Sequence, residues 1–194
     1  MQYQAAKTHI LERLGRELPK ELTYHSLAHT KDVLRVVTEL CELEGIDNYD
    51  TRLLQTAACY HDSGFLISHI DHEEIGCKIA TATLPRYGYT PAQIARICGM
   101  IRATRIPQSP QNKLEEILCD ADLDYLGRED FYTIGRTLFQ EFCHFNVVDD
   151  EESWNRLQMA FLRMHSYFTS TNRRRREPQK RTYLSAISSL VEGA

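Results

Sequence analysis

In the stretch LLQTAACYHDSGF, residues 53–65, the polar residues His61 and Asp62 directly follow a mainly apolar run. Its apolar residues recur with the period of an α-helix, and Gly64 is a natural end point for that helix. An unpartnered imidazole or carboxylate is costly to bury, so His61 and Asp62 need partners from other parts of the chain. Strict period-two alternation is almost absent from the rest of the sequence. We therefore expect an all-α protein.

The same periodicity predicts a single-domain helical bundle of about eight to nine helices over residues 1–194. The predicted helices cover approximately residues 1–18, 27–43, 50–61, 72–84, 91–104, 114–125, 130–144, 151–168 and 178–191. Asp50 is the expected N-cap of the third helix, and Thr90-Pro91 supplies the cap and first-turn proline of the fifth. The polar chemistry then falls at helix ends and in loops.

Composition and charge favour a globular protein of the cytoplasm. The net charge of −4 gives no general attraction to nucleic acid or to an anionic membrane. We expect no membrane span, because no charge-free stretch is long enough.

The six cysteines are scattered without any C-x-x-C pair, which favours buried reduced thiols. The basic run Arg173–Arg176 is interpreted as the solvent-exposed start of a helix, with contact to an acidic partner, nucleic acid or phosphate as the alternative.

Four residues combine imidazole and carboxylate groups that suit a divalent metal ion: His29, His61, Asp62 and Asp122. Nitrogen and oxygen donors together favour Mn²⁺, Fe²⁺, Co²⁺ or Zn²⁺, and they also accept Mg²⁺. Four such ligands leave open positions on an octahedral ion for water and a substrate oxygen, which is typical of a catalytic site. Taken singly, each residue has an ordinary structural explanation, such as a hydrogen-bonded core histidine.

The segments that carry these residues occur in a fixed order: H-T-K-D-V at 29–33, A-A-C-Y-H-D-S-G-F at 57–65 and C-D-A-D-L-D-Y-L-G at 119–127. This set resembles the HD superfamily of metal-dependent phosphohydrolases, whose pattern H…HD…D lies on a helical bundle. As in that pattern, Val33 follows His29 by four residues. The resemblance covers about residues 24–127, and the helices within 130–191 are expected to pack on this core.

Two further histidines are candidates for catalytic roles. His25 competes with His29 for the first ligand position, and the spacing to Val33 favours His29. His25 then lies one turn earlier, where it either faces the substrate phosphate or caps the helix. His72 opens HEEIGCKIA, which resembles the H-x-x-x-G segment of many family members. Dinuclear relatives such as the HD-GYP phosphodiesterases add a His-His pair that this sequence lacks, so we expect one ion per chain.

The resemblance implies hydrolysis of a phosphomonoester or phosphodiester, most often of a nucleotide, by metal-activated water. Asp62 and Asp122 are ligands that could also take a proton from that water. His25 or His72 could donate a proton to the leaving group. We therefore expect an enzyme of the phosphatase or phosphodiesterase class.

Phosphate recognition requires cations or backbone N–H groups near the site. Lys78, Arg102 and Arg105 are the cations nearest in sequence, and a solvated helix face explains each of them about as well.

The alternative function is a regulatory module that binds a metal or a nucleotide without turnover. A nucleic-acid-binding function ranks lowest, because the chain lacks interleaved aromatics and a basic surface. The partner is then a small phosphate ester, and a homodimer is compatible with a small helical bundle.

Overall fold

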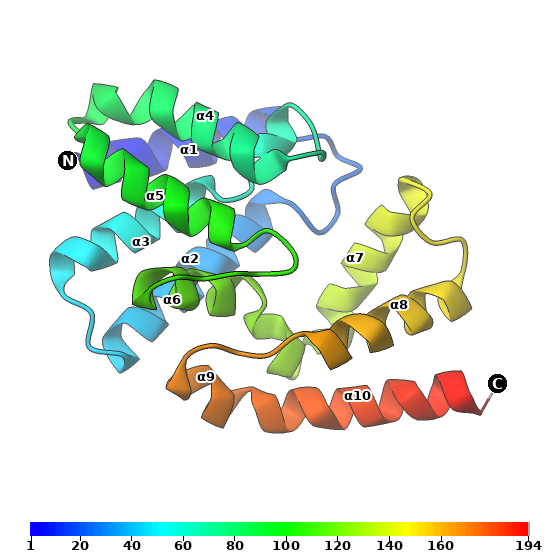
Figure 1. The fold of residues 1–194 in the computed structure, drawn as a ribbon. Coiled ribbons are helices and arrows are strands. Elements are labelled where there is room, and N and C mark those ends of the chain that lie inside the picture. Colours follow the sequence, from blue (N-terminus) through cyan, green and yellow to red (C-terminus); the bar gives the residue numbers. More distant parts are fainter. Residues whose placement is uncertain (194) are drawn as a thin grey trace. The chain divides into compact units, whose positions relative to one another are not determined.

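The computed structural model describes residues 1–193, which form helices and no strand (Figure 1). The all-α prediction is confirmed. The described α-helices are α1 (Tyr3–Glu17), α2 (Leu27–Leu43), α3 (Asn48–Tyr60), α4 (His72–Thr83), α5 (Pro91–Ala103), α6 (Lys113–Asp122), α7 (Phe131–His144), α8 (Glu151–Met164), α9 (Ser170–Arg175) and α10 (Glu177–Glu192). Three short 3₁₀ helices are also present: η1 (Ser63–Leu66), η2 (Leu84–Tyr87) and η3 (Asp124–Gly127).

The chain divides into two compact units. The first unit comprises residues 1–19 and 25–122, and it contains α1 to α6. The second unit comprises residues 20–24 and the described residues from Leu123 onward, with α7 to α10. That residues 1–194 form a single domain stays a prediction.

The first unit is built around α2, α3, α5 and α6. Helix α2 packs on α3 and α6, while α5 packs on α3, α4 and α6. The apolar faces of these helices are fully buried, as shown by Leu40, Leu54, Ile97 and Leu118. Each such side chain contributes roughly 1.5–3 kcal/mol when it leaves water. This packing fixes where the ends of the helices lie.

Local signals set most helix boundaries in the first unit. Helix α2 begins and ends as predicted, and Thr90 and Gln93 form a reciprocal capping box at the start of α5. The predicted cap of α3 is wrong by almost one turn. Asp47, not Asp50, is the N-cap, and its carboxylate accepts a hydrogen bond from the Asp50 N–H at 2.9 Å. Both residues are good caps, and the choice depends on where the chain leaves Gly45.

In the second unit, α8 and α10 lie side by side and run antiparallel, with α9 between them along the chain (Figure 1). The predicted helix over 151–168 is wrong beyond Met164, because His165 is extended and its carbonyl accepts a hydrogen bond from the Lys180 ammonium. Thr169 then caps α9, a helix that the sequence pattern did not predict.

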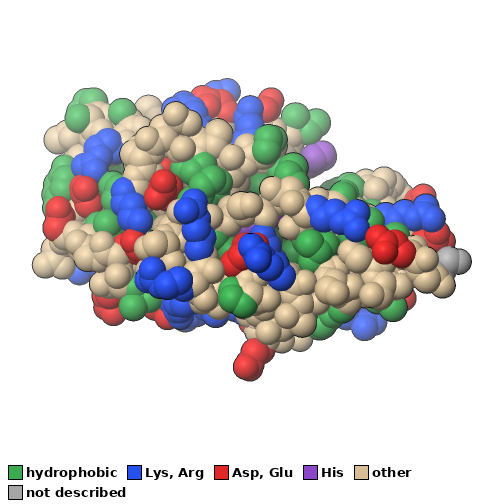
Figure 2. Space-filling view, turned by 60° about the horizontal axis from the view of Figure 1, so that its bottom comes forward, with side chains coloured by type: hydrophobic (Ala, Val, Ile, Leu, Met, Phe, Trp, Pro, Cys, Tyr) green, Lys and Arg blue, Asp and Glu red, His purple; other side chains and the backbone are tan. Residues whose placement is uncertain are grey.

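Helix α9 carries most of the arginine run. The Arg173 side chain donates to the Tyr167 carbonyl at 2.9 Å, and Arg176 donates to the buried Asp124 carboxylate at 2.8 Å. Arg173, Arg174 and Arg175 are exposed. Figure 2 shows Lys and Arg side chains scattered among acidic and neutral ones on one face of the molecule. The run therefore contributes to the internal structure of the second unit as well as to its surface.

The remaining sequence expectations concern membranes and cysteines. Among the described helices, none combines the length and the apolar character that crossing a membrane requires. Five cysteines are buried and Cys143 is half-buried, and all six are free thiols. Buried reduced thiols are what their scattered positions predicted.

Candidate metal centre

The ends of three packed helices carry the predicted metal ligands in the first unit. His29 lies in the first turn of α2, His61 is the C-cap of α3 with Asp62 directly after it, and Asp122 is the last residue of α6. Residues separated by as many as 93 positions in the sequence thereby meet at one point. The C-terminal ends of α3 and α6 add partial negative charge, which favours a cation there.

The donor atoms of these side chains form a tight cluster. His29 Nε2 lies 3.3 Å from His61 Nε2, and Asp122 Oδ1 lies 3.1 Å from the former and 3.3 Å from the latter. Asp62 Oδ2 lies 3.1 Å from His61 Nε2 and 3.4 Å from His29 Nε2. Donors bound at about 2.1 Å to one ion, at right angles to each other, stand about 3 Å apart. His29, His61 and Asp122 therefore have the spacing of three ligands of one ion, and Asp62, whose Oδ2 lies beside both imidazoles, is the fourth candidate.

Two features show that the residues suit a bound cation. Within the described chain, Asp62 Oδ2 is buried and has no hydrogen-bond partner, although it faces two imidazoles. The Ala58 carbonyl lies 2.8 Å from His61 Nδ1 and can only accept a hydrogen bond. The neutral ring thus carries its proton on Nδ1 and turns the Nε2 lone pair toward the cluster. A cation would satisfy both atoms at once.

The electrostatics of the cluster favour positive charge. Burial alone lowers the pKa of His61, but Asp62 and Asp122 beside it raise that pKa well above its usual value. Burial alone raises the pKa of Asp62, yet the neighbouring histidines, His61 first, hold it well below its usual range. The pKa of Asp122 is lowered in the same way by His29 and His61, against the effect of burial. Both carboxylates are therefore ionised at neutral pH.

The centre is buried on one side and reachable on the other. The His61 side chain is completely buried, whereas 15% of the Asp122 side chain and 21% of the His72 side chain remain exposed. A purely structural site is usually closed by its protein ligands. The side chains of this centre do not close it completely, and its exposed edge lies at Asp122 and His72.

His25 and His72 lie beside the centre. The His25 ring stacks on Phe65 at 4.2 Å between centroids, and the His72 ring contacts Phe65 at 4.3 Å. His72 Nε2 lies 3.6 Å from Asp62 Oδ1, the oxygen opposite to the one in the cluster. Both histidines are thus adjacent to the ligands rather than among them. Sequence reasoning missed Phe65, since an aromatic after a glycine is indistinguishable from core.

Gly64 allows the HD segment to approach α4. A Cβ at this position would lie 1.9 Å from the carbonyl oxygen of His72, far inside contact distance, and the obstacle is backbone. The glycine therefore permits η1, which follows Asp62, to pass directly against the start of α4. This close approach brings His72 next to Asp62.

The three predicted phosphate-binding cations line a groove of about 340 Å³ between α4 and the end of α5, together with Asp71, Glu74 and Ile75. Arg102 forms a bidentate pair with Glu74 at 2.7 and 3.1 Å. Arg105 donates to Asp71 at 3.0 Å. Lys78 makes no ion pair with any described residue. Together with the larger effect of Arg102, its charge nevertheless lowers the pKa of Glu74.

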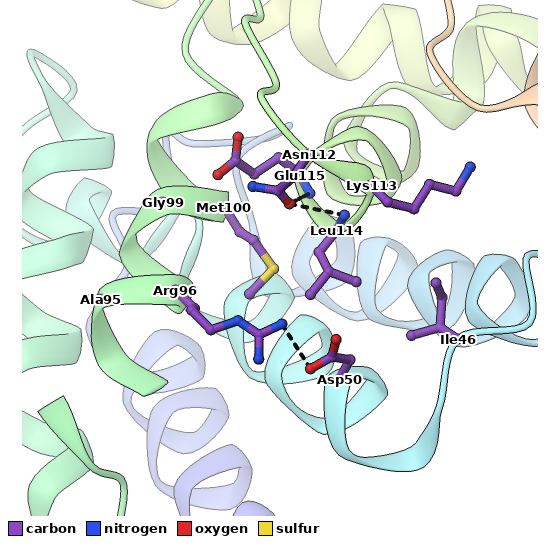
Figure 3. Close-up of a pocket in the computed structure, with 10 residues that line it drawn as sticks. All are labelled: Ile46, Asp50, Ala95, Arg96, Gly99, Met100, Asn112, Lys113, Leu114 and Glu115. Atoms are coloured by element: carbon purple, nitrogen blue, oxygen red, sulfur yellow. Dashed lines mark hydrogen bonds and ion pairs between the residues drawn. The ribbon is translucent and has the colours of Figure 1, made fainter. Parts of the chain in front are cut away.

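A larger cavity of about 590 Å³ lies at the opposite ends of the ligand-bearing helices (Figure 3). Its lining comes from the starts of α3 and α6 and the middle of α5, whereas His61 and Asp122 end α3 and α6. Met100 and Leu114 point into it, and an ion pair of 2.8 Å joins Arg96 to Asp50 at its side (Figure 3). None of the predicted site residues lines this cavity.

The all-α fold and the His–Asp cluster together define a helical protein with a centre that could hold a metal ion. Residues 26–124, just over half of the 194 residues, match the HD domain family. The chain belongs to this family, whose members are in general metal-dependent hydrolases.

A comparison with solved structures agrees with this assignment. The fold is similar to the crystal structure of a predicted HD superfamily hydrolase from an uncultured Thermotogales bacterium, with a TM-score of 0.62. The two chains are 20% identical over 98% of this chain and 91% of the other, so the likeness shows a shared fold. No curated protein matches the sequence.

The geometry predicts about one divalent ion per chain. His29→Ala, His61→Ala and Asp122→Ala should each lower the metal content of the purified protein, because each removes one of four clustered donors. His25→Ala should leave it intact. Elemental analysis of metal-loaded, desalted samples measures the number of ions bound per chain in each variant. Unchanged content in His61→Ala and Asp122→Ala would exclude this site, and two tightly held ions would contradict a mononuclear centre.

Gly64→Ala should disturb the centre from outside the ligand set. The new methyl group must push η1 away from the backbone of His72, at a cost of at least about 2 kcal/mol in the free energy of unfolding. The metal content of Gly64→Ala should also be lower than that of wild type. Gly99→Ala is the matched control, since its Cβ would meet only the flexible end of Glu115 at 3.1 Å. Urea unfolding curves test the pair, and equal stability of the two variants would refute the role of Gly64.

Proposed function

We propose that this protein is a metal-dependent phosphohydrolase that cleaves a phosphomonoester or phosphodiester bond of a small molecule, with a nucleotide as the preferred class. The cluster of His29, His61, Asp62 and Asp122 is the observation that carries the proposal. The donor atoms of His29, His61 and Asp122 lie 3.1–3.3 Å apart, Asp62 Oδ2 lies within 3.4 Å of both imidazoles, and one edge is open to solvent. Family membership supports a hydrolase, and the ordered HD motif supports phosphate chemistry.

These four side chains would hold one divalent ion, with Mn²⁺, Fe²⁺, Co²⁺, Zn²⁺ and Mg²⁺ as the candidates. When bound, the ion supplies Lewis acidity toward a phosphate oxygen and lowers the pKa of water toward neutrality. The chain itself holds these side chains in fixed positions. The carboxylates Asp62 and Asp122 are held ionised by the imidazoles beside them, which suits them to bind a cation next to the reacting phosphate.

Departure of an alkoxide requires a proton donor on the other side of the scissile bond. His72 Nε2 and the His25 ring are both held against Phe65 within reach of the centre, and neither belongs to the ligand cluster. We assign the role of proton donor to these two residues. Lys78 is the proposed contact for a phosphate oxygen or a second anionic group, because the neighbouring arginines are already bound to carboxylates.

Turnover should require metal and an intact centre. Protein loaded with Mn²⁺, Co²⁺ or Mg²⁺ should release phosphate, or cleave the diester bond, in a screen of nucleotides, cyclic nucleotides and aryl phosphates. Chelator should abolish the activity, and Asp122→Ala purified in parallel should have none. The parallel purification separates this activity from contaminating phosphatases. Absence of turnover by metal-loaded protein on every compound would favour a binding module without catalysis.

His25 and His72 should be separable from the ligands. His72→Ala and His25→Ala should keep their metal while kcat falls by roughly 10²–10⁴-fold, the usual cost of losing general acid catalysis. His144→Ala, which removes an exposed histidine of the second unit, is the control and should match wild type. Steady-state kinetics measure kcat of each variant, and elemental analysis measures its metal content. If His25→Ala sheds metal while His29→Ala retains it, His25 is the first ligand.

A further inference from the structure

His72 is flanked in the sequence by two acidic residues, and one arginine contacts both of them. Arg105, just beyond the end of α5, donates from Nη2 to Asp71 Oδ1 at 3.0 Å. Its Nε lies 3.4 Å from Glu73 Oε2. The three residues Asp71, His72 and Glu73 form the start of α4. A single guanidinium therefore ties both neighbours of His72 to the end of another helix.

Glu73 is an unusual member of this group because it is buried. Only 6% of the residue is exposed, whereas Glu74 beside it is 40% exposed in its side chain. A buried carboxylate is costly unless it is paired. The partners of Glu73 are Arg105 on one oxygen and His72 on the other, where Oε1 lies 3.6 Å from His72 Nε2. Burial of this carboxylate is thus tied to the position of the His72 ring.

Further contacts restrain the His72 ring. Its Nδ1 lies 3.3 Å from the His69 carbonyl, which can only accept a hydrogen bond. Its face packs on Phe65, and its Nε2 lies equally far, 3.6 Å, from Asp62 Oδ1 and Glu73 Oε1. A continuous row of contacts therefore runs from Arg105 through Glu73 and His72 to the ligand Asp62.

We propose that Arg105 and Glu73 are positioning residues that hold the His72 imidazole beside Asp62. The proposal rests on the hydrolase function proposed above and adds to it. Arg105 acts through the protein and does not bind substrate, which changes the role expected from its place in the sequence. Asp71 assists because its left-handed backbone, with φ of 53°, begins α4 at the point that Arg105 holds.

Kinetics distinguish a positioning arginine from a phosphate-binding one. Loss of a substrate contact raises KM, whereas loss of positioning lowers kcat and leaves KM unchanged. Glu73→Gln and Arg105→Gln should each lower kcat about tenfold or more, the usual effect of removing a group that orients a functional histidine. KM and metal content should stay near those of wild type. Arg105→Lys, which keeps the charge, should restore part of kcat.

Arg96→Gln is the matched control. Arg96 lies on α5, whose end Arg105 follows, and its side chain is 43% exposed against 51% for Arg105. Like Arg105, it pairs with an aspartate, at 2.8 Å. It does not contact the neighbours of His72. Its substitution should cost similar stability without changing kcat. A raised KM with unchanged kcat in Arg105→Gln, or an equal loss of kcat in Arg96→Gln, would overturn the proposal.

A measurement without turnover separates this proposal from the hydrolase function. Long-range ¹H–¹⁵N spectra of the Zn²⁺-loaded protein report the histidine rings, and His72→Ala identifies the His72 signals. These signals should move in Glu73→Gln and Arg105→Gln and stay in place in Arg96→Gln. Unmoved His72 signals in both variants would refute the positioning role. Shifted signals in a protein that turns over no phosphate ester would keep the positioning role and refute the hydrolase.

Discussion

Two ionised carboxylates and two imidazoles share one small, mostly buried volume, and they require positive charge among them. Asp62 and Asp122 remain charged because His29 and His61 lie within 3.4 Å. Without a proton or a metal ion, the four side chains would oppose each other with little water to screen them. The helices of the first unit must therefore hold together a group of side chains whose own interactions do not favour assembly.

Apolar packing supplies that restraint. Leu40, Leu54 and Leu118 are fully buried on the three helices that carry ligands, one on each helix. The polar residues lie at the ends of these helices, where the apolar stripe stops and the helix leaves N–H groups, at the start of α2, or carbonyls, at the ends of α3 and α6, without partners of its own. The interior of each helix thus stabilises the unit, and its end carries a side chain proposed to bind the metal ion. The close approach at Gly64 extends this frame to α4 and to His72.

The all-α fold and the family could be predicted from the sequence, because both follow from local periodicity and from an ordered motif. Local signals also predicted the bounds of α2 and the start of α5, but some other helix starts and breaks could not be predicted. Asp47 caps α3 where Asp50 was expected, and α8 ends where Lys180 reaches back to His165. That contact joins residues 15 positions apart, and the one between Arg105 and Asp71 spans 34. A linear pattern does not encode such pairs, so Glu73 was indistinguishable from any acidic residue in a first helical turn.

The hydrogen bond between His61 Nδ1 and the Ala58 carbonyl lies within one helix, so α3 alone sets the direction of this ring. The other donors are likewise attached to helices packed at fixed separations. Such a frame neither contracts nor expands easily, because protein interiors are close-packed. Ca²⁺ takes oxygen ligands and is poorly matched to a frame that presents two imidazole nitrogens, whereas Mn²⁺, Fe²⁺, Co²⁺ and Zn²⁺ accept nitrogen and oxygen donors together. By fixing which donor atoms face one another, the packing of a few leucines would decide which metal ions the centre accepts.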